Sequence, residues 1–209
     1  MTIGNPVKNA VGPTLTLGAF VSILVFPVAA LAEPATFEVD SDHFSMSFEV
    51  MHIGYAPVIG MFRDVEGEFV YDDATGKLES GSLVFKSRSI FTNHKKRDEH
   101  LRGSDFLHSS KYPDITFNLT GFEATGEQTG KVTGDLRMLG QTNPVTLDVT
   151  LNKSAEYPIG HEDCTLGISA ETELRRSDWG MTYGLDPALV GDEVRLRFGF
   201  EANQKSGWF

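Results

Sequence analysis

The fold of this chain is decided by the stretch LVFKSRSIFTNHKKRDEHLRGSDFLHSSKYPDITF, residues 83–117. Residues 83–88 alternate between two faces, which is the period of a β-strand. The alternation then stops, and Thr92 or Asn93 can cap a short helix in the polar sequence that follows. Pro113 holds the residue before it in an extended conformation, and a second alternating run comes after it. The stretch therefore predicts two strands with a polar helical excursion between them.

Short alternating runs also occupy most of the remaining chain. They lie at residues 37–40, 43–53, 62–71, 132–138, 145–151, 166–174 and 194–201. The polar segment 152–163 is typical of a loop. About eight strands and almost no helix are typical of an antiparallel barrel or a sandwich. Faces rich in Phe and Met favour a single all-β barrel, whose open end residues 93–102 can cap through Leu101 and Phe106.

The clearest strand is the run from His43 to Ile53. One of its faces carries Phe44, Met46, Phe48 and Val50 and ends at His52. Such a face is ordinarily part of a hydrophobic core, although aromatic and thioether side chains also suit a flexible apolar ligand. Because residues two apart share one side of a strand, we expect Met46 to face the interior and Ser47 to face water.

The N-terminus has the pattern of a cleaved secretory signal. Lys8 precedes an apolar run from about Leu15 to Ala30, and Ala30-Leu31-Ala32 has the small-x-small pattern of a cleavage site. An uncleaved membrane anchor is the alternative. We expect a signal peptide at residues 1–32, one domain at residues 33–204 and a tail at residues 205–209. The expected location is the periplasm or the outside of the cell.

The composition is acidic. The sequence holds 18 Lys and Arg against 29 Asp and Glu, and removing Lys8 with the signal leaves 17 against 29, a net charge of −12. Such a surface repels nucleic acid and anionic lipid headgroups. The mature protein is therefore expected to bind no nucleic acid and not to be peripheral on a membrane. Because the signal is expected to be cleaved, we also expect that the mature protein is not an integral membrane protein.

Cys164 is the single cysteine, so it forms no internal disulfide. A nucleophile and an intermolecular link are the functional alternatives to a small packing residue at the start of a strand, which is the interpretation adopted here. Its role, like the formation of a homodimer, stays open.

Two groups of polar residues were weighed for chemistry. His94, His100 and His108 do not have the spacing of metal ligands on one helix face, so no metal site is predicted. Arg97, Asp98 and His100 include an acid, a base and a cation, but no nucleophile motif accompanies them. A polar cap over the barrel, or a contact to a ligand headgroup, is the preferred interpretation.

Several short motifs resemble the YceI-like family of polyisoprenoid-binding proteins. In chain order they are Phe48-x-Val50-x-His52, Gly60-x-Phe62, Ser89-Ile90-x-Thr92-Asn93, Arg97-Asp98-Glu99-His100-Leu101, Phe106, Tyr112-Pro113-x-Ile115-x-Phe117, Gly134-x-Leu136-x-x-x-Gly140, Pro144-Val145-x-Leu147, Arg176-Ser177-Asp178-Trp179-Gly180 and Gly191-Asp192-x-Val194. Each is weak alone, but together they span the chain from Phe37 to the last strand. Phe91 departs from the pattern, which has a small acidic residue there.

The resemblance implies an elongated lipocalin-like barrel that holds a polyprenyl compound or a quinone as cargo, with no cofactor. Ligand contacts are then expected from Phe44, Met46, Phe48, Val50, Phe85, Ile90, Leu101, Phe106 and Phe117. A headgroup or structural cap is expected from His52, Asn93, Arg97, Asp98 and His100. The alternatives are an enzyme acting on such a lipid through Arg97, Asp98 and His100, and a stress-induced barrel that its own side chains fill.

Overall fold

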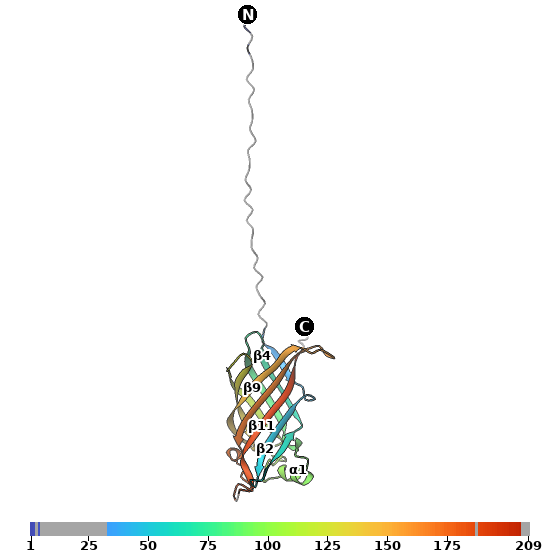
Figure 1. Ribbon diagram of the computed structural model, residues 1–209, viewed down its shortest axis with the longest axis vertical. Helices are drawn as coiled ribbons and strands as arrows, with labels where there is room; N and C mark the ends of the chain where they lie inside the picture. Colours follow the sequence, from blue (N-terminus) through green and yellow to red (C-terminus); the bar gives the residue numbers. More distant parts are fainter. Residues whose placement is uncertain (3, 5–32, 187, 206–209) are drawn as a thin grey trace. The chain divides into compact units, whose positions relative to one another are not determined.

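The computed structural model describes residues 1, 2, 4, 33–186 and 188–205 (Figure 1). The described residues from Glu33 to Lys205 belong to one compact unit. The expected signal peptide lies almost wholly outside the described residues, as does the expected tail after Lys205. Where the chain is described, no helix has the length and apolar character that a membrane crossing needs.

The compact unit is almost entirely β-structure. Its strands are β1 (Ala35–Val39), β2 (Ser45–His52), β3 (Ala56–Phe62), β4 (Val65–Asp72), β5 (Lys77–Lys86), β6 (Ile90–Phe91), β7 (Asp114–Ala124), β8 (Thr129–Met138), β9 (Gln141–Glu156), β10 (Cys164–Arg175) and β11 (Val190–Gln204). One α-helix, α1 (Lys95–Leu101), and two 3-10 turns, Ser87–Ser89 and Arg176–Trp179, complete the elements of the described residues.

These strands close into an antiparallel barrel with eight positions. The neighbours run β1-β4-β5-β7-β8-β9-β10-β11, and β11 pairs with β1 to close the wall. Three of the eight positions each contain two strands. β1 and β2 both pair with β11 and share the first position, and their neighbours β4 and β3 share the second. β5 pairs with β4 and β6 pairs with β3, so these two strands share the third. The prediction of an all-β barrel of about eight strands with one short helix is confirmed.

The core is divided between two ends of the barrel. A small cluster of Phe37, Leu166 and Ala202 is almost completely buried and fills the end at which β1 begins and β11 ends. A larger cluster occupies the rest of the interior and includes Trp179, whose indole N–H donates to the carbonyl of Leu136 at 2.9 Å. The apolar material that holds the barrel together therefore lies inside it.

Helix α1 lies at the other end, beside the end of β2 (Figure 1). Its N-cap is His94, whose Nδ1 accepts from the backbone N–H of Arg97 at 3.2 Å, so the expectation of a Thr92 or Asn93 cap is wrong. Asn93 instead adopts a left-handed φ of 58° that turns the chain into the helix. Leu101 and Phe106 pack against the larger cluster, as predicted.

Strand β9 is longer than its sequence indicates. The polar segment after residue 151 was expected to be a loop, but β9 continues to Glu156 and pairs with β10 as far as Cys164. A register shift at Gly167/Ile168 lets the ladder continue past the end of the regular alternation. The barrel wall therefore continues past residue 151 through polar residues of β9 and β10.

Candidate ligand-binding cavity

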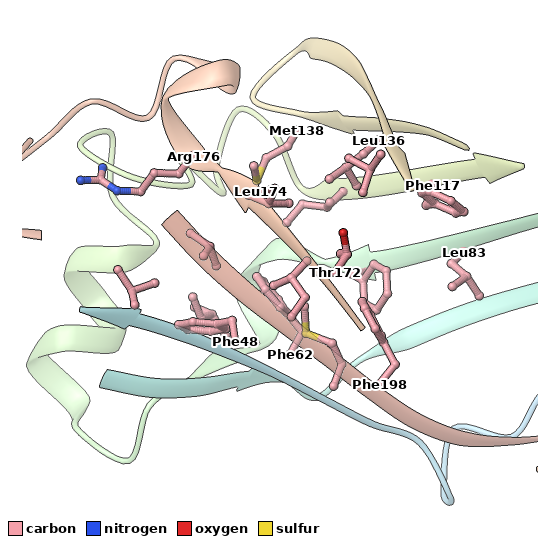
Figure 2. Close-up of a pocket in the computed structure, with 18 of the residues that line it drawn as sticks. Phe48, Phe62, Leu83, Phe117, Leu136, Met138, Thr172, Leu174, Arg176 and Phe198 are labelled. Atoms are coloured by element: carbon pink, nitrogen blue, oxygen red, sulfur yellow. The ribbon is translucent and has the colours of Figure 1, made fainter. Parts of the chain in front are cut away.

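A cavity of about 530 Å³ runs through the barrel between the small buried cluster and α1. Its size is within the range of about 300–1,000 Å³ usual for small-molecule sites. Figure 2 shows side chains from opposite walls converging on it, among them Phe48, Phe117 and Phe198. Nearly all of its lining is aliphatic, aromatic or thioether, so it is suited to an apolar occupant.

Eight of the nine residues predicted to contact a ligand line this cavity. They are Met46, Phe48, Val50, Phe85, Ile90, Leu101, Phe106 and Phe117. The ninth, Phe44, does not, because it lies in the bend before β2 and its ring packs 5.9 Å from Phe85 and 5.7 Å from Phe200. The face of β2 was thus assigned to the correct side, whereas its ligand contacts stay a prediction.

The five polar residues expected at the cap divide into two sets. His52, Arg97 and His100 line the cavity. Asn93 is exposed and Asp98 is buried, and neither reaches the cavity. A headgroup contact is therefore open to the first three only, while Asp98 has a structural role.

That structural role is a hydrogen-bond network around Thr92. The carboxylate of Asp98 accepts from the backbone N–H of Thr92 at 2.8 Å and from its hydroxyl at 2.5 Å. Arg97 donates to the Thr92 hydroxyl and to its carbonyl, both at 2.7 Å. Because both charged side chains bind Thr92, they hold α1 against β6, and Asp98 does not reach the cavity to form an acid–base pair there with Arg97.

His100 belongs to an aromatic group at the end of the cavity. Its Nε2 lies 2.9 Å from a carboxylate oxygen of Asp105. Its ring contacts Phe106 and Tyr183 with centroids 5.0 and 5.1 Å away, and these two rings lie 5.2 Å from each other. The group joins α1 to the loop before β11, and so it forms one side of the cavity mouth.

Sequence reasoning missed Arg176 as a residue of the cavity. It is 3% exposed and donates to the carbonyls of Gly191, Met181, Tyr183 and Val190 at 2.7–2.9 Å. Burial lowers the pKa of Arg176, and the nearby Asp192 carboxylate opposes that shift. The guanidinium thus anchors the loop between β10 and β11 at the mouth of the barrel.

The C-terminal half of the chain supplies much of the cavity wall that was not predicted. Alternation in the sequence could have found these residues, since they share faces on β8, β10 and β11: Leu136, Met138, Ala170, Leu174, Leu196 and Phe198. Thr172 is a polar member of that wall, and its hydroxyl donates to the carbonyl of Thr146 at 2.8 Å. Its hydroxyl hydrogen is therefore already used within the protein.

The cavity reaches the surface beside α1. Four of its lining side chains are 40–45% exposed, namely Met51, Ile53, Tyr183 and Leu189. They lie at the end of β2, on the β2–β3 turn and on the loop before β11. The turn and the loop are joined by the hydrogen bond from Ile53 N–H to the carbonyl of Leu189 at 3.0 Å. These exposed apolar side chains give an apolar molecule a place to enter.

The histidines considered for metal binding have other partners. His94 caps α1, His100 faces Asp105, and the His108 ring lies 5.8 Å from that of Tyr112. Within the described residues, the group with the spacing of metal ligands is Asp40, His43 and Glu201, at the bend between β1 and β2. That group lies outside the cavity lining.

Comparison with known proteins adds a family. The model of the YceI-like domain matches residues 37–202. A UPF0312 protein of Pseudomonas putida strain GB-1 is 37% identical over 155 residues, which cover 73% of this chain and 80% of the relative.

Solved structures share the fold. BcnA of Burkholderia cenocepacia aligns with a TM-score of 0.71 at 23% identity, over 79% of this chain and 99% of that one. A polyisoprenoid-binding domain from Saccharophagus degradans, implicated in plant cell wall breakdown, aligns with a TM-score of 0.61 at 12% identity, over 83% and 100%. At these identities the likeness concerns the barrel alone.

Proposed function

The chain belongs to the YceI-like family, and on that premise we propose that it binds an isoprenoid lipid inside its barrel and carries or sequesters it outside the cytoplasm. The cargo is a polyprenyl compound or a quinone, whose branched hydrocarbon tail lies along the apolar wall. The polar residues at the α1 end then meet whatever headgroup the lipid has. No step of catalysis is part of this function.

The apolar cavity is the observation that supports this proposal. Thr172 and Arg176, two of its few polar side chains, already donate to carbonyls within the protein, so this part of the interior requires little hydrogen bonding from a ligand. Each methylene moved from water into such a wall contributes about 0.8 kcal/mol. A long hydrocarbon tail therefore binds tightly without any strong polar contact.

A binding role is favoured over catalysis by the placement of the polar residues. Arg97 and Asp98 are joined through Thr92, and His100 faces Asp105. The three do not converge on one point of the cavity, which an acid–base reaction would need. The name of the Saccharophagus domain, a polyisoprenoid-binding protein of the same fold, gives independent support for a lipid cargo.

The expected export of the chain supports a role as a carrier. Ala30-Leu31-Ala32 has the pattern of a signal-peptide cleavage site. An isoprenoid lipid that leaves one membrane needs a protein that shields its tail from water, and a closed barrel with an apolar interior provides that shield.

Mass spectrometry of lipid extracted from the natively purified protein tests this function. The protein is taken from its own cell envelope without detergent, so that the cargo is the one it meets there. A polyprenyl compound or quinone in amounts comparable with the protein is the expected result. Fatty acids or phospholipids in its place, or no lipid at all, would refute the assignment.

A further inference from the structure

We propose that the end of the barrel that carries α1 docks onto the surface of an anionic lipid bilayer. The docking surface has two parts, an apolar rim and a basic collar. The apolar rim is Met51, Ile53, Tyr55, Ile59, Tyr183 and Leu189, and the basic collar is the segment of residues 87–113. This goes beyond cargo binding, because it names the surface from which cargo is taken or to which it is delivered.

The apolar rim is unusually exposed. Tyr55 is 89% exposed and Ile59 60%, at the turn and on the outer face of the β2–β3 hairpin. Exposed apolar groups that lie together mark an interaction site, whereas single ones are ordinary. The rim is also continuous with the cavity, since Met51, Ile53, Tyr183 and Leu189 line both. A lipid can thus pass from the docking surface into the barrel along side chains of one kind.

The turn at the tip of the β2–β3 hairpin holds an apolar residue, Ile53, in a strained backbone conformation. Ile53 and Gly54 have φ of 51° and 70°, and Tyr55 N–H donates to the carbonyl of His52 at 3.0 Å. Two such residues make the hairpin turn in which Asn-Gly is preferred. A β-branched side chain at positive φ is unfavourable, and Ile53 is nearly half exposed. The turn therefore places a half-exposed apolar side chain at the mouth of the cavity, at a backbone position that disfavours it.

The basic collar identifies the partner as an anionic membrane. Residues 87–113 hold six Lys and Arg against three Asp and Glu, although the whole sequence holds 18 against 29. Lys95 and Lys96 are exposed on α1. The Lys and Arg that form ion pairs in the described structure lie outside the collar: Lys77, Lys86, Lys131, Arg195 and Lys205. Arg97 and Arg102 of the collar donate to Thr92 and to the carbonyls of Arg88 and Ile90, so the charge that is available to lipid headgroups is chiefly that of Lys95 and Lys96.

The collar and the rim belong to one surface. His100 of α1 contacts Tyr183 of the rim, and Arg97 lines the same cavity as Ile53. Basic side chains beside exposed Tyr and aliphatic side chains are the composition of a segment that lies in a bilayer interface. The acidic net charge of the sequence predicted repulsion from such a surface, but net charge does not show how the charges are distributed.

Flotation with phosphatidylethanolamine–phosphatidylglycerol vesicles tests the docking, with phosphatidylcholine vesicles as the neutral reference. The wild type should float with the anionic vesicles and much less with the neutral ones. Lys95→Glu with Lys96→Glu should lower this binding by about tenfold or more. The matched control is Lys153→Glu, an exposed lysine near the far end of β9, which should leave the binding unchanged.

The rim is tested by Ile53→Asn combined with Tyr55→Ser, with Ile159→Asn as the control at another exposed isoleucine. Asn fits the left-handed turn better than Ile, so the rim variant should unfold at an equal or higher temperature while its vesicle binding is lost. A merely structural role of Ile53 would give a lower unfolding temperature instead.

Two results would overturn the docking surface. One is vesicle binding that the rim and charge variants keep. The other is a wild-type dimer in solution that the rim variant dissociates, with no vesicle binding, because a second copy would then cover the rim. Cargo binding is measured separately by lipid extraction, so a failure of docking is distinguishable from a failure of the proposed function.

Discussion

Arg176 shows how a single buried charge organises one end of the barrel. Its guanidinium donates to four carbonyls, two in the loop between β10 and β11 and two at the start of β11. Lysine carries its donors on one nitrogen and cannot reach four separate acceptors. Arg176→Lys should therefore lower the free energy of unfolding by about 3 kcal/mol, measured by urea titration.

The neighbouring Arg175 supplies the control for that prediction. It is exposed at the end of β10, so Arg175→Lys should change the free energy of unfolding by less than about 0.5 kcal/mol. Equal losses in the two variants would mean that the buried hydrogen bonds of Arg176 do not stabilise the loop.

His43 is the residue whose protonation the fold most clearly favours. Its Nδ1 lies 2.7 Å from a carboxylate oxygen of Asp40, and this contact raises the pKa of His43. A raised pKa adds stability that is fully present below the ordinary histidine pKa and is lost as the pH rises through the raised value. In an NMR titration, Asp40→Asn should return the pKa of His43 toward about 6.5. An unchanged titration would show that another group is responsible.

At the scale of one strand, β2 separates the interior from water. Met46 is buried in the cavity wall, whereas Ser47 lies on the other face opposite Arg197. A carboxylate at position 46 meets an apolar wall and costs several kcal/mol or stays protonated. Met46→Asp should thus lose co-purifying lipid or fail to fold, while Ser47→Asp should fold and keep its lipid. A folded Met46→Asp that keeps lipid while Ser47→Asp loses it would reverse the assignment of faces.

Alternation explains why the faces of β2 could be predicted and other features could not. A period of two assigns Met46 and Phe48 to one side whatever the strand pairs with. Which of those residues reach a cavity depends on the opposite wall, and for that reason Phe44 was misplaced. The His94 cap is a local contact, but histidine is not among the preferred N-cap residues, so the sequence favoured Thr92 or Asn93 in its place. The carbonyls that Arg176 reaches lie as far as 15 residues away, and no local pattern contains them.

At the scale of the barrel, the two ends differ. One is filled by Phe37, Leu166 and Ala202, and the other opens between α1 and two loops. The composition predicted the acidic net charge of the whole chain, but it did not predict that a basic segment lies beside the opening of the cavity. That distribution follows from the path of the chain, which brings α1 next to the β2–β3 turn and the loop before β11. The opening beside α1 gives the cargo a route in and out.

Native mass spectrometry of the detergent-free protein from its own cells, wild type beside Ala170→Trp, tests most directly whether the cavity holds lipid. Ala170 is buried in the cavity wall, so an indole there takes the space that a tail would occupy. Its neighbour Ser169 is exposed, which makes Ser169→Trp the control. We predict one bound lipid in the wild type and in Ser169→Trp, and loss of the lipid-bound fraction in a folded Ala170→Trp. Wild-type protein without added mass, or a folded Ala170→Trp that keeps its lipid, would contradict the account.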